Sequence, residues 1–230
     1  SFGLGLGNKE GAPYQTSAFN SYFGSTILNQ TTYGGRYGTN YDNTYHLFSV
    51  EGYNFIIIFI EYDYSMTSSS HAVIQWADSV LKAYSNRRAI VVTHYLLNSD
   101  AENTFAPQGA AIYEGLKNNP NFFLMLGGHN DTAGMRTDVY NSNTVYSLRS
   151  DYQTVDEHQS GYLRIMRFSP SADKIYVSTY SPTQNKWRTT ANEQFELNYA
   201  MNGGGDFNFL GSTTVSSGAN ASLSWKGLSN

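Results

Sequence analysis

The chain has 230 residues and a formal net charge of −4, with 40% hydrophobic residues, only 14% charged residues and no cysteine. This length suits one substantial domain, or one domain and the start of another. The composition excludes disulfides, thiolate metal sites and a cysteine nucleophile, and the lack of a basic stripe argues against nucleic acid as a partner.

The first third of the chain predicts strands on either side of a long irregular stretch. Residues 1–8 form an apolar segment typical of a short buried strand that ends at Gly7-Asn8. Residues 11–45 are rich in Gly, Tyr, Asn and Thr and show little periodicity, so we expect a surface excursion. Two strands then flank a turn at Glu51-Gly52, and the second, residues 55–61, is apolar enough to be covered on both faces.

The middle of the chain alternates helices and strands. Residues 68–86 place apolar side chains at helical spacing after serines suited to the N-cap, and a buried strand over 87–94 follows. A second helix over 106–119 has Pro107 in its first turn, and residues 121–129 form a third buried strand. This alternation predicts parallel strands joined by crossover helices.

The pattern changes after Gly134. Four short strands separated by turns predict an antiparallel meander between residues 134 and 181. We therefore expect an α/β fold with a parallel half and an antiparallel half, in a domain over 1–204. Residues 205–230 are expected to be a linker and the truncated start of a β-sandwich-like module.

Polar, metal-capable residues follow three of the expected strands. They are Asn8, His94 and His129, and Asp131 lies two positions after the last of them. The carboxyl ends of strands in an open α/β sheet line the ligand crevice, so these side chains are expected to converge there. Two imidazoles and an amide oxygen suit a divalent transition metal ion, and a carboxylate suits it as a further ligand.

Each of these residues also has a structural interpretation. A histidine at a strand end is commonly held by structural hydrogen bonds, Asn8 suits a turn, and Asp131 before Thr132 suits a turn or helix cap. Only the coincidence of three such strand ends in one α/β chain favours the metal site.

Three segments in order, "GNKE" at 7–10, "VVTHY" at 91–95 and "LGGHNDTAGMRTD" at 126–138, resemble motifs of the calcineurin-like metallophosphoesterases of the secreted type. The resemblance covers roughly residues 1–200. It implies a sandwich of two mixed β-sheets flanked by helices, in which two metal ions at one edge hold a phosphate ester and a bridging hydroxide attacks the phosphorus.

The resemblance also implies roles for individual residues and exposes departures from the family. Asn8, His94 and His129 match three ligands of one metal ion. Lys9 stands where the family has its catalytic histidine, and Asp131 stands where it has a ligand of the other metal. Lysine is a poor proton donor at neutral pH because its reference pKa is about 10.4. The family's Asp-x-His and Gly-Asp motifs are expected before residue 1, and Asp42, Glu61 and Asp63 do not match them.

These departures favour a weakened or inactive phosphoesterase domain of an extracellular protein, with one divalent metal ion bound, or none. An active two-metal phosphoesterase completed by an N-terminal segment is one alternative. A non-catalytic extracellular module that binds a partner, a glycan or copies of itself is another, because tyrosines abound in polar surroundings. We expect residues 1–8 to lie against an N-terminal fragment or a neighbouring copy, and we expect no membrane span.

Overall fold

A computed structural model describes residues 2–11, 13–155, 160–201 and 207–210 of the chain. The helices are η1 (Asn8–Glu10), α1 (Ser17–Leu28), α2 (Ala72–Ala83) and α3 (Pro107–Leu116). The strands are β1 (Tyr33–Arg36), β2 (Thr44–Val50), β3 (Tyr53–Ile60), β4 (Arg88–Tyr95), β5 (Phe122–Gly128), β6 (Thr132–Tyr140), β7 (Asn143–Asp151), β8 (Leu163–Ser169), β9 (Lys174–Ser181), β10 (Lys186–Arg188), β11 (Phe195–Asn198) and β12 (Phe207–Leu210).

A seven-stranded mixed sheet forms the centre of the molecule, with the strand order β1-β2-β3-β4-β5-β7-β6. Strands β3, β4, β5 and β7 run parallel to one another, and the remaining pairs are antiparallel. The expected hairpin at Glu51-Gly52 joins β2 to β3, and the expected alternation of helices and parallel strands is confirmed. All four parallel strands therefore end at the same edge of the sheet.

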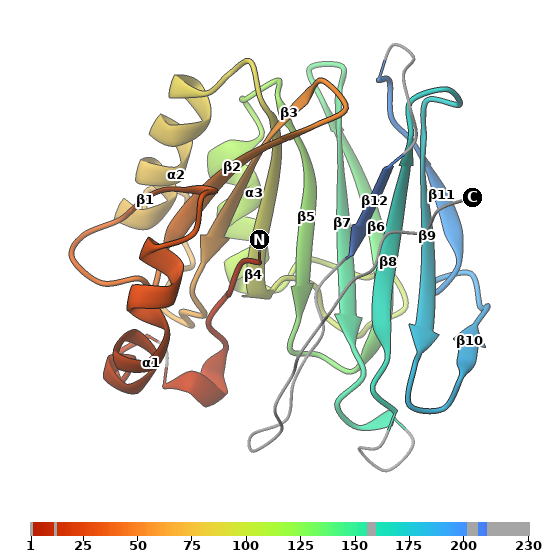
Figure 1. The fold of residues 1–230 in the computed structure, drawn as a ribbon, viewed down its shortest axis with the longest axis horizontal. Helices are drawn as coiled ribbons and strands as arrows, with labels where there is room; N and C mark the ends of the chain where they lie inside the picture. Colours follow the sequence, from red (N-terminus) through yellow and green to blue (C-terminus); the bar gives the residue numbers. More distant parts are fainter. Residues whose placement is uncertain (1, 12, 156–159, 202–206, 211–230) are drawn as a thin grey trace.

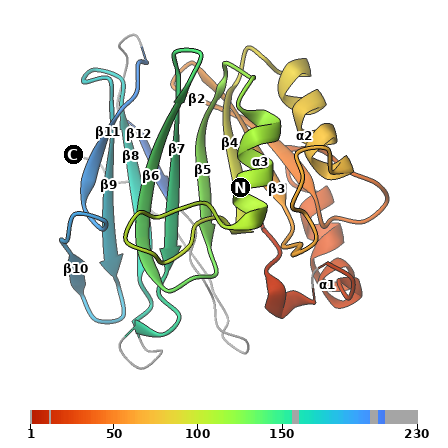
Figure 2. The same ribbon diagram turned by 180° about the vertical axis from the view of Figure 1, so that it is seen from behind.

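The central sheet separates two hydrophobic clusters. Helices α2 and α3 cover one face, and the second sheet covers the other (Figures 1 and 2). Strand β3 contributes side chains to both hydrophobic clusters. Ile56, Ile58 and Ile60 face the helices, whereas Phe55 and Phe59 face the second sheet. This division explains why β3 is apolar from Phe55 to Ile60, as a strand buried on both faces must be.

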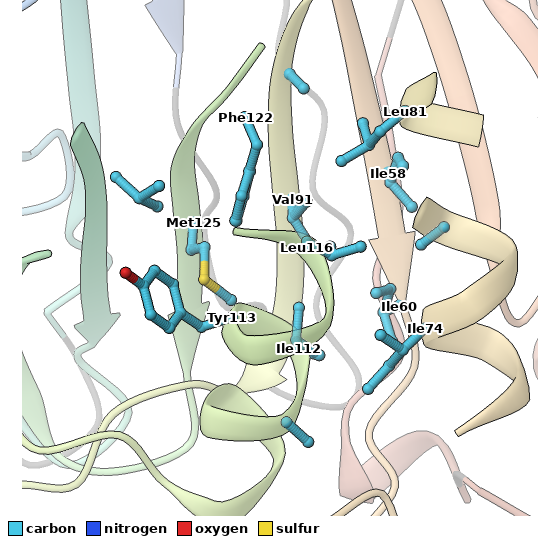
Figure 3. Close-up of a cluster of buried hydrophobic side chains, with 14 of the residues drawn as sticks. Ile58, Ile60, Ile74, Leu81, Val91, Ile112, Tyr113, Leu116, Phe122 and Met125 are labelled. Carbon is cyan, nitrogen blue, oxygen red and sulfur yellow. The ribbon is translucent and has the colours of Figure 1, made fainter. Parts of the chain in front are cut away.

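Helix α2 shows how the sequence produces the helical layer. Val73, Ile74, Ala77 and Leu81 are its buried residues, and they pack against the sheet beside residues of α3 (Figure 3). Complete burial of a side chain such as Leu81 stabilises the fold by about 1.5–3 kcal/mol. The expected serine cap is wrong, because the N-cap residue is His71 and its side chain makes no capping hydrogen bond. Pro107 does begin α3.

The second sheet has the order β10-β9-β8-β12, with β11 also paired to β9. All of its pairs in the described part of the chain are antiparallel, so the expectation of two mixed sheets holds for the central one alone. The expected four-strand meander is also wrong. Strands β6 and β7 form a hairpin in the central sheet, where β7 pairs in parallel with β5, and the second sheet begins at β8.

Two other expectations about the first 45 residues are wrong. Residues 2–7 contain no strand, although Leu6 is fully buried and its carbonyl accepts a hydrogen bond from the backbone N–H of Tyr62 at 2.9 Å. A Cβ atom on Gly5 would touch Phe59 and Val92, so the segment crosses side chains of the sheet rather than extending its ladder. The stretch expected as a surface excursion contains helix α1 and strand β1.

The chain after β11 returns to the second sheet. The backbone of β12 pairs with β8 from Phe207 to Leu210, within the stretch 205–230 that was expected to be a linker and the start of another module. Residues 211–230 lie outside the described part. The boundary at 204–205 stays a prediction. Among the described residues, no helix is long and apolar enough to span a membrane.

Candidate metal site at the carboxyl edge of the central sheet

The three residues selected from the strand ends meet at the carboxyl edge of the central sheet. The Nε2 atom of His94 lies 3.1 Å from the Oδ1 atom of Asn8 and 3.1 Å from the Nδ1 atom of His129. The predicted convergence is therefore present, with Asn8 in η1, His94 in β4 and His129 directly after β5.

A glycine allows η1 to approach the sheet this closely. A Cβ atom on Gly7 would lie 2.9 Å from the Cε1 and Nδ1 atoms of His94, which is too close for any side chain. The Gly7 N–H donates to the Glu10 carboxylate at 2.8 Å, and Gly11 ends the turn with a φ of 86°. The sequence "GNKEG" thus presents Asn8 to the histidines.

His129 occupies a strained backbone position. Its φ is +69°, in the left-handed region that non-glycine residues seldom adopt. The neighbouring residue holds the turn, because Asn130 donates from its backbone N–H to the Gly128 carbonyl and from its side chain to the Leu97 carbonyl, both at 2.9 Å. Strain of this kind costs about 1–3 kcal/mol and persists only where the surroundings enforce it.

The pKa values of both histidines are depressed. Burial, together with a smaller contribution from the nearby His129, lowers the pKa of His94 to about 4. Burial also lowers the pKa of His129, with Lys9 adding to the depression and Asp151 opposing it. Both rings are therefore neutral near pH 7, which is the form that binds metal ions.

The chemistry of the three facing atoms fits a cation. The Nε2 atom of His94 carries either one hydrogen or one lone pair, yet it faces two other atoms that can act as acceptors. Two ligand atoms about 2.1 Å from one metal ion and about 90° apart are separated by roughly 3 Å, close to the spacings seen here. One amide oxygen and two imidazoles suit a divalent transition metal.

Aromatic rings enclose the histidine pair. The Tyr62 ring centroid lies 5.8 Å from that of His94 and 5.3 Å from that of His129. The Tyr95 ring lies 4.8 Å from His129 on another side. These tyrosines fix the planes of the imidazoles and desolvate them, which accounts for part of the depressed pKa values.

The other two predicted site residues do not join the cluster through any hydrogen bond. Lys9 is exposed on η1, and its effect on His129 is that of a nearby positive charge. Asp131 is exposed and its Oδ1 accepts a hydrogen bond from the Thr154 hydroxyl at 2.9 Å, as a turn residue does. Among the described residues, no three His, Cys, Asp or Glu side chains are grouped to hold a metal ion.

Sequence reasoning missed Asp151, which ends β7. It is 4% exposed, and its charge raises the pKa of His129. A Cβ atom on the adjacent Gly128 would lie 3.6 Å from its Oδ2 atom. The signal was present in the sequence, because Asp151 stands at the end of an expected strand, as His94 and His129 do. It was overlooked because that strand was assigned to an antiparallel meander instead of the parallel set.

A separate polar cluster lies beside the site, around the end of β3. Asn43 donates to the Oε1 atom of Glu61 at 2.7 Å, while the Oε2 atom is buried with no partner among the described residues. The pKa of Glu61 is raised to about 7, mainly by burial, with the charges of Asp42 and Asp63 adding to the rise and the hydrogen bond from Asn43 opposing it. Asp42 in turn accepts hydrogen bonds from Thr16 and other side chains of the first 40 residues.

No family model matches the chain. It is 35% identical over 187 residues to the uncharacterized protein YvnB of Bacillus subtilis (strain 168). The matched region covers 77% of this chain and 14% of that protein. The chain therefore spans about a seventh of this relative.

Two solved structures are similar to the chain, each at 14% sequence identity. One is a dimetal phosphatase from Danio rerio, with a TM-score of 0.44, covering 69% of this chain and 62% of that one. The other is GAP50, the anchor in the inner membrane complex of Plasmodium, with a TM-score of 0.40, covering 70% of this chain and 55% of that one.

Proposed function

We propose that this chain carries a metallophosphoesterase-like site that binds one divalent transition-metal ion through Asn8, His94 and His129. The observation that supports the proposal is the meeting of their three side-chain atoms at 3.1 Å spacings, from three separate segments of the chain. The order and flanks of the three motifs support the same family. When bound, the metal ion would act as a Lewis acid on a phosphate ester.

We propose further that hydrolysis by this chain is weak or absent. Lys9 replaces the histidine that would protonate the leaving oxygen, and Asp131 is engaged by Thr154 in an exposed turn. General acid catalysis by a well-placed side chain typically contributes about 10²–10⁴-fold to the rate. The chain's own residues would hold and orient a phosphate ester while lacking an efficient proton donor. A fully active two-metal enzyme, completed by a segment before residue 1, remains the alternative within this class.

Metal binding can be tested by titrating the chain with Co²⁺, using calorimetry and visible absorption. We expect one ion per chain, with imidazole ligands, and at least about 100-fold weaker binding in the variants His94→Ala and His129→Ala. His71→Ala is the matched control, because it also removes a histidine, but one at the start of α2 that is not a proposed ligand. A chain that binds no ion, or whose His94→Ala variant binds it equally well, would contradict the proposal.

Exposed tyrosines support a second candidate function, a non-catalytic extracellular binding or self-assembling module. Tyr14 and Tyr64 are 72% and 61% exposed, and their rings meet edge to face with centroids 6.4 Å apart. Exposed tyrosine supplies contact area with a hydrogen-bonding tip. Binding of the chain to immobilised glycans, or self-association in light scattering, that Tyr14→Ala with Tyr64→Ala abolishes would favour this function. A monomer without glycan affinity would count against it.

A further inference from the structure

The edge of the central sheet opposite the histidines contains a pocket with a volume of about 430 Å³. It is lined by the turns that precede β4, β5 and β7 and by the residues that follow β11. In Figure 1 these segments lie at the upper ends of the strands, whereas η1 lies at the lower ends. The pocket is therefore separate from the candidate metal site.

Two arginines give the pocket its charge. Arg87 and Arg88 both line it, and the lining contains no aspartate or glutamate. Arg87 donates from Nη1 to the carbonyls of Phe48 and Phe55, at 3.2 and 3.1 Å. No ion pair of either arginine is found within the part of the chain that the structure describes.

Arg88 is held in a fixed orientation by aromatic rings. Its guanidinium carbon lies 5.0 Å from the centroid of the Tyr199 ring and 5.5 Å from that of Tyr53. Its Nη1 atom donates to the carbonyl of Ala200 at 3.1 Å. A guanidinium has five N–H donors in a rigid fork, so this arrangement leaves donors for a bidentate contact with an oxyanion.

An unsatisfied acceptor accompanies the two cations. The side-chain amide of Asn121, which lines the pocket, donates to the carbonyls of Leu81, Tyr84 and Arg87, and these bonds fix its orientation. Its Oδ1 atom is buried and has no donor among the described residues. Because this oxygen has almost no exposed surface, a ligand in the pocket does not reach it, and the Asn121 side chain acts as part of the pocket wall.

We propose that this pocket binds a small hydroxylated organic oxyanion. Arg88, assisted by Arg87, holds the carboxylate or phosphate group through charged hydrogen bonds. Polar side chains of the lining, such as Ser85 and Asn86, form hydrogen bonds with the ligand's hydroxyl groups. A volume of about 430 Å³ accommodates a compact ligand such as a single sugar acid or sugar phosphate.

The test is calorimetry on the chain freed of metal with a chelating resin, with glucuronate, glucose 6-phosphate and glucose as probes. These share a hydroxylated ring and differ in their acidic group. We expect both acids to bind and glucose to bind at least tenfold more weakly, because the charged hydrogen bonds are lost. The tighter of the two acids identifies the carboxylate or the phosphate as the natural group. Equal binding of glucose, or no binding of either acid, overturns the proposal.

Variants separate the pocket from other cationic surfaces. Arg88→Gln should weaken binding of the acids about tenfold or more, and Arg88→Lys, which keeps the charge but not the fork, should weaken it less. Arg36→Gln is the matched control, since that arginine also lies over a tyrosine ring, Tyr41, at 4.3 Å. Unchanged binding in Arg88→Gln overturns the proposal.

A second measurement needs no variant and applies if Arg88→Gln fails to fold. Raising the salt concentration from about 0.05 to 0.5 M screens charged contacts, so binding of the acids should weaken several-fold. Binding that is independent of salt overturns the proposal.

Discussion

The two edges of the central sheet present opposite chemistry. At the carboxyl edge, two neutral imidazoles and an amide oxygen bring together three atoms that can bind a cation. At the amino edge, two guanidinium groups line a pocket without a carboxylate. The first edge suits a cation and the second suits an anion. Side chains that follow parallel strands are close together, as are those that precede them, so a single sheet can build both sites at once.

The two edges also differ in what holds their functional side chains in place. Asn8 reaches the histidines from a short turn that depends on a glycine, whereas Arg88 is fixed by two aromatic rings and a carbonyl. The carboxyl edge is therefore the more sensitive to small changes in shape. The following predictions test that edge, from the largest expected effect to the smallest.

The first prediction concerns Lys9, which stands where the resembling family has its catalytic histidine. Lys9→His should raise the turnover of a chromogenic phosphate diester in the presence of Co²⁺ by about 100-fold, because an imidazole can protonate the leaving group near neutral pH. The pH profile should gain a limb near pH 6.5. Asp131→His, added to it, should raise the number of bound ions.

Lys186→His serves as the control for this prediction, since Lys186 lies in β10, away from the site. If Lys9→His binds the metal ion but shows the same turnover as the unaltered chain, then the lack of a histidine at position 9 is not what limits hydrolysis.

The second prediction concerns the close approach of η1. Gly7→Ala places a Cβ atom 2.9 Å from the His94 ring, so Asn8 must move away. We expect at least tenfold weaker Co²⁺ binding and a loss of about 1–3 kcal/mol in the free energy of unfolding. Gly5→Ala is the control, because its Cβ would make ordinary contacts at 3.6 and 3.7 Å. Similar behaviour of the two variants would refute the role of Gly7.

Much of this edge could be predicted from the sequence, because the relevant signals are local. Strand β5 is an apolar run that ends in two glycines before His129, and helix α2 has a regular apolar face. Such patterns alone predict that His94 and His129 lie at the same edge of the sheet.

What could not be predicted depends on contacts between distant segments. Helix α1 buries only Phe19, Gly24 and Ile27, and its exposed Tyr22 and Phe23 obscure the helical periodicity. Strand β7 lies beside β5 because the β6–β7 hairpin folds back across the sheet, which no local pattern specifies. The positions of Asp151 at the site and of Arg88 between two rings both follow from such long-range packing.

The third prediction concerns Glu61, whose pKa in the folded chain is raised to about 7 by burial. The folded chain holds this proton up to about pH 7, whereas the unfolded chain releases it near its ordinary pKa of 4.5. The contribution of Glu61 to stability is therefore full below pH 4.5 and is lost as the pH rises to 7. Glu61→Gln should stabilise the chain at pH 8 by about 1–2 kcal/mol, allowing for partial exposure.

Denaturant unfolding at pH 5 and pH 8 checks this prediction, with Glu51→Gln at the exposed β2–β3 turn as the control. A gain from Glu61→Gln that is equal at both pH values would mean that the carboxyl is not protonated in the folded chain.

The smallest expected effect belongs to Asp151, whose charge opposes the depression of the His129 pKa. Asp151→Asn removes that charge and should lower the pKa of His129 further, which NMR titration of the imidazole would detect. The ring remains neutral at pH 7 in either case, so Co²⁺ affinity should fall only a few-fold, through the loss of a nearby negative charge. A larger fall, comparable with that of His94→Ala, would mean that Asp151 is itself a ligand. In that case a carboxylate from β7 would help to hold the cation at the carboxyl edge. That edge would then bind its ligand through a negatively charged group, whereas the amino edge binds its ligand through positively charged guanidinium groups.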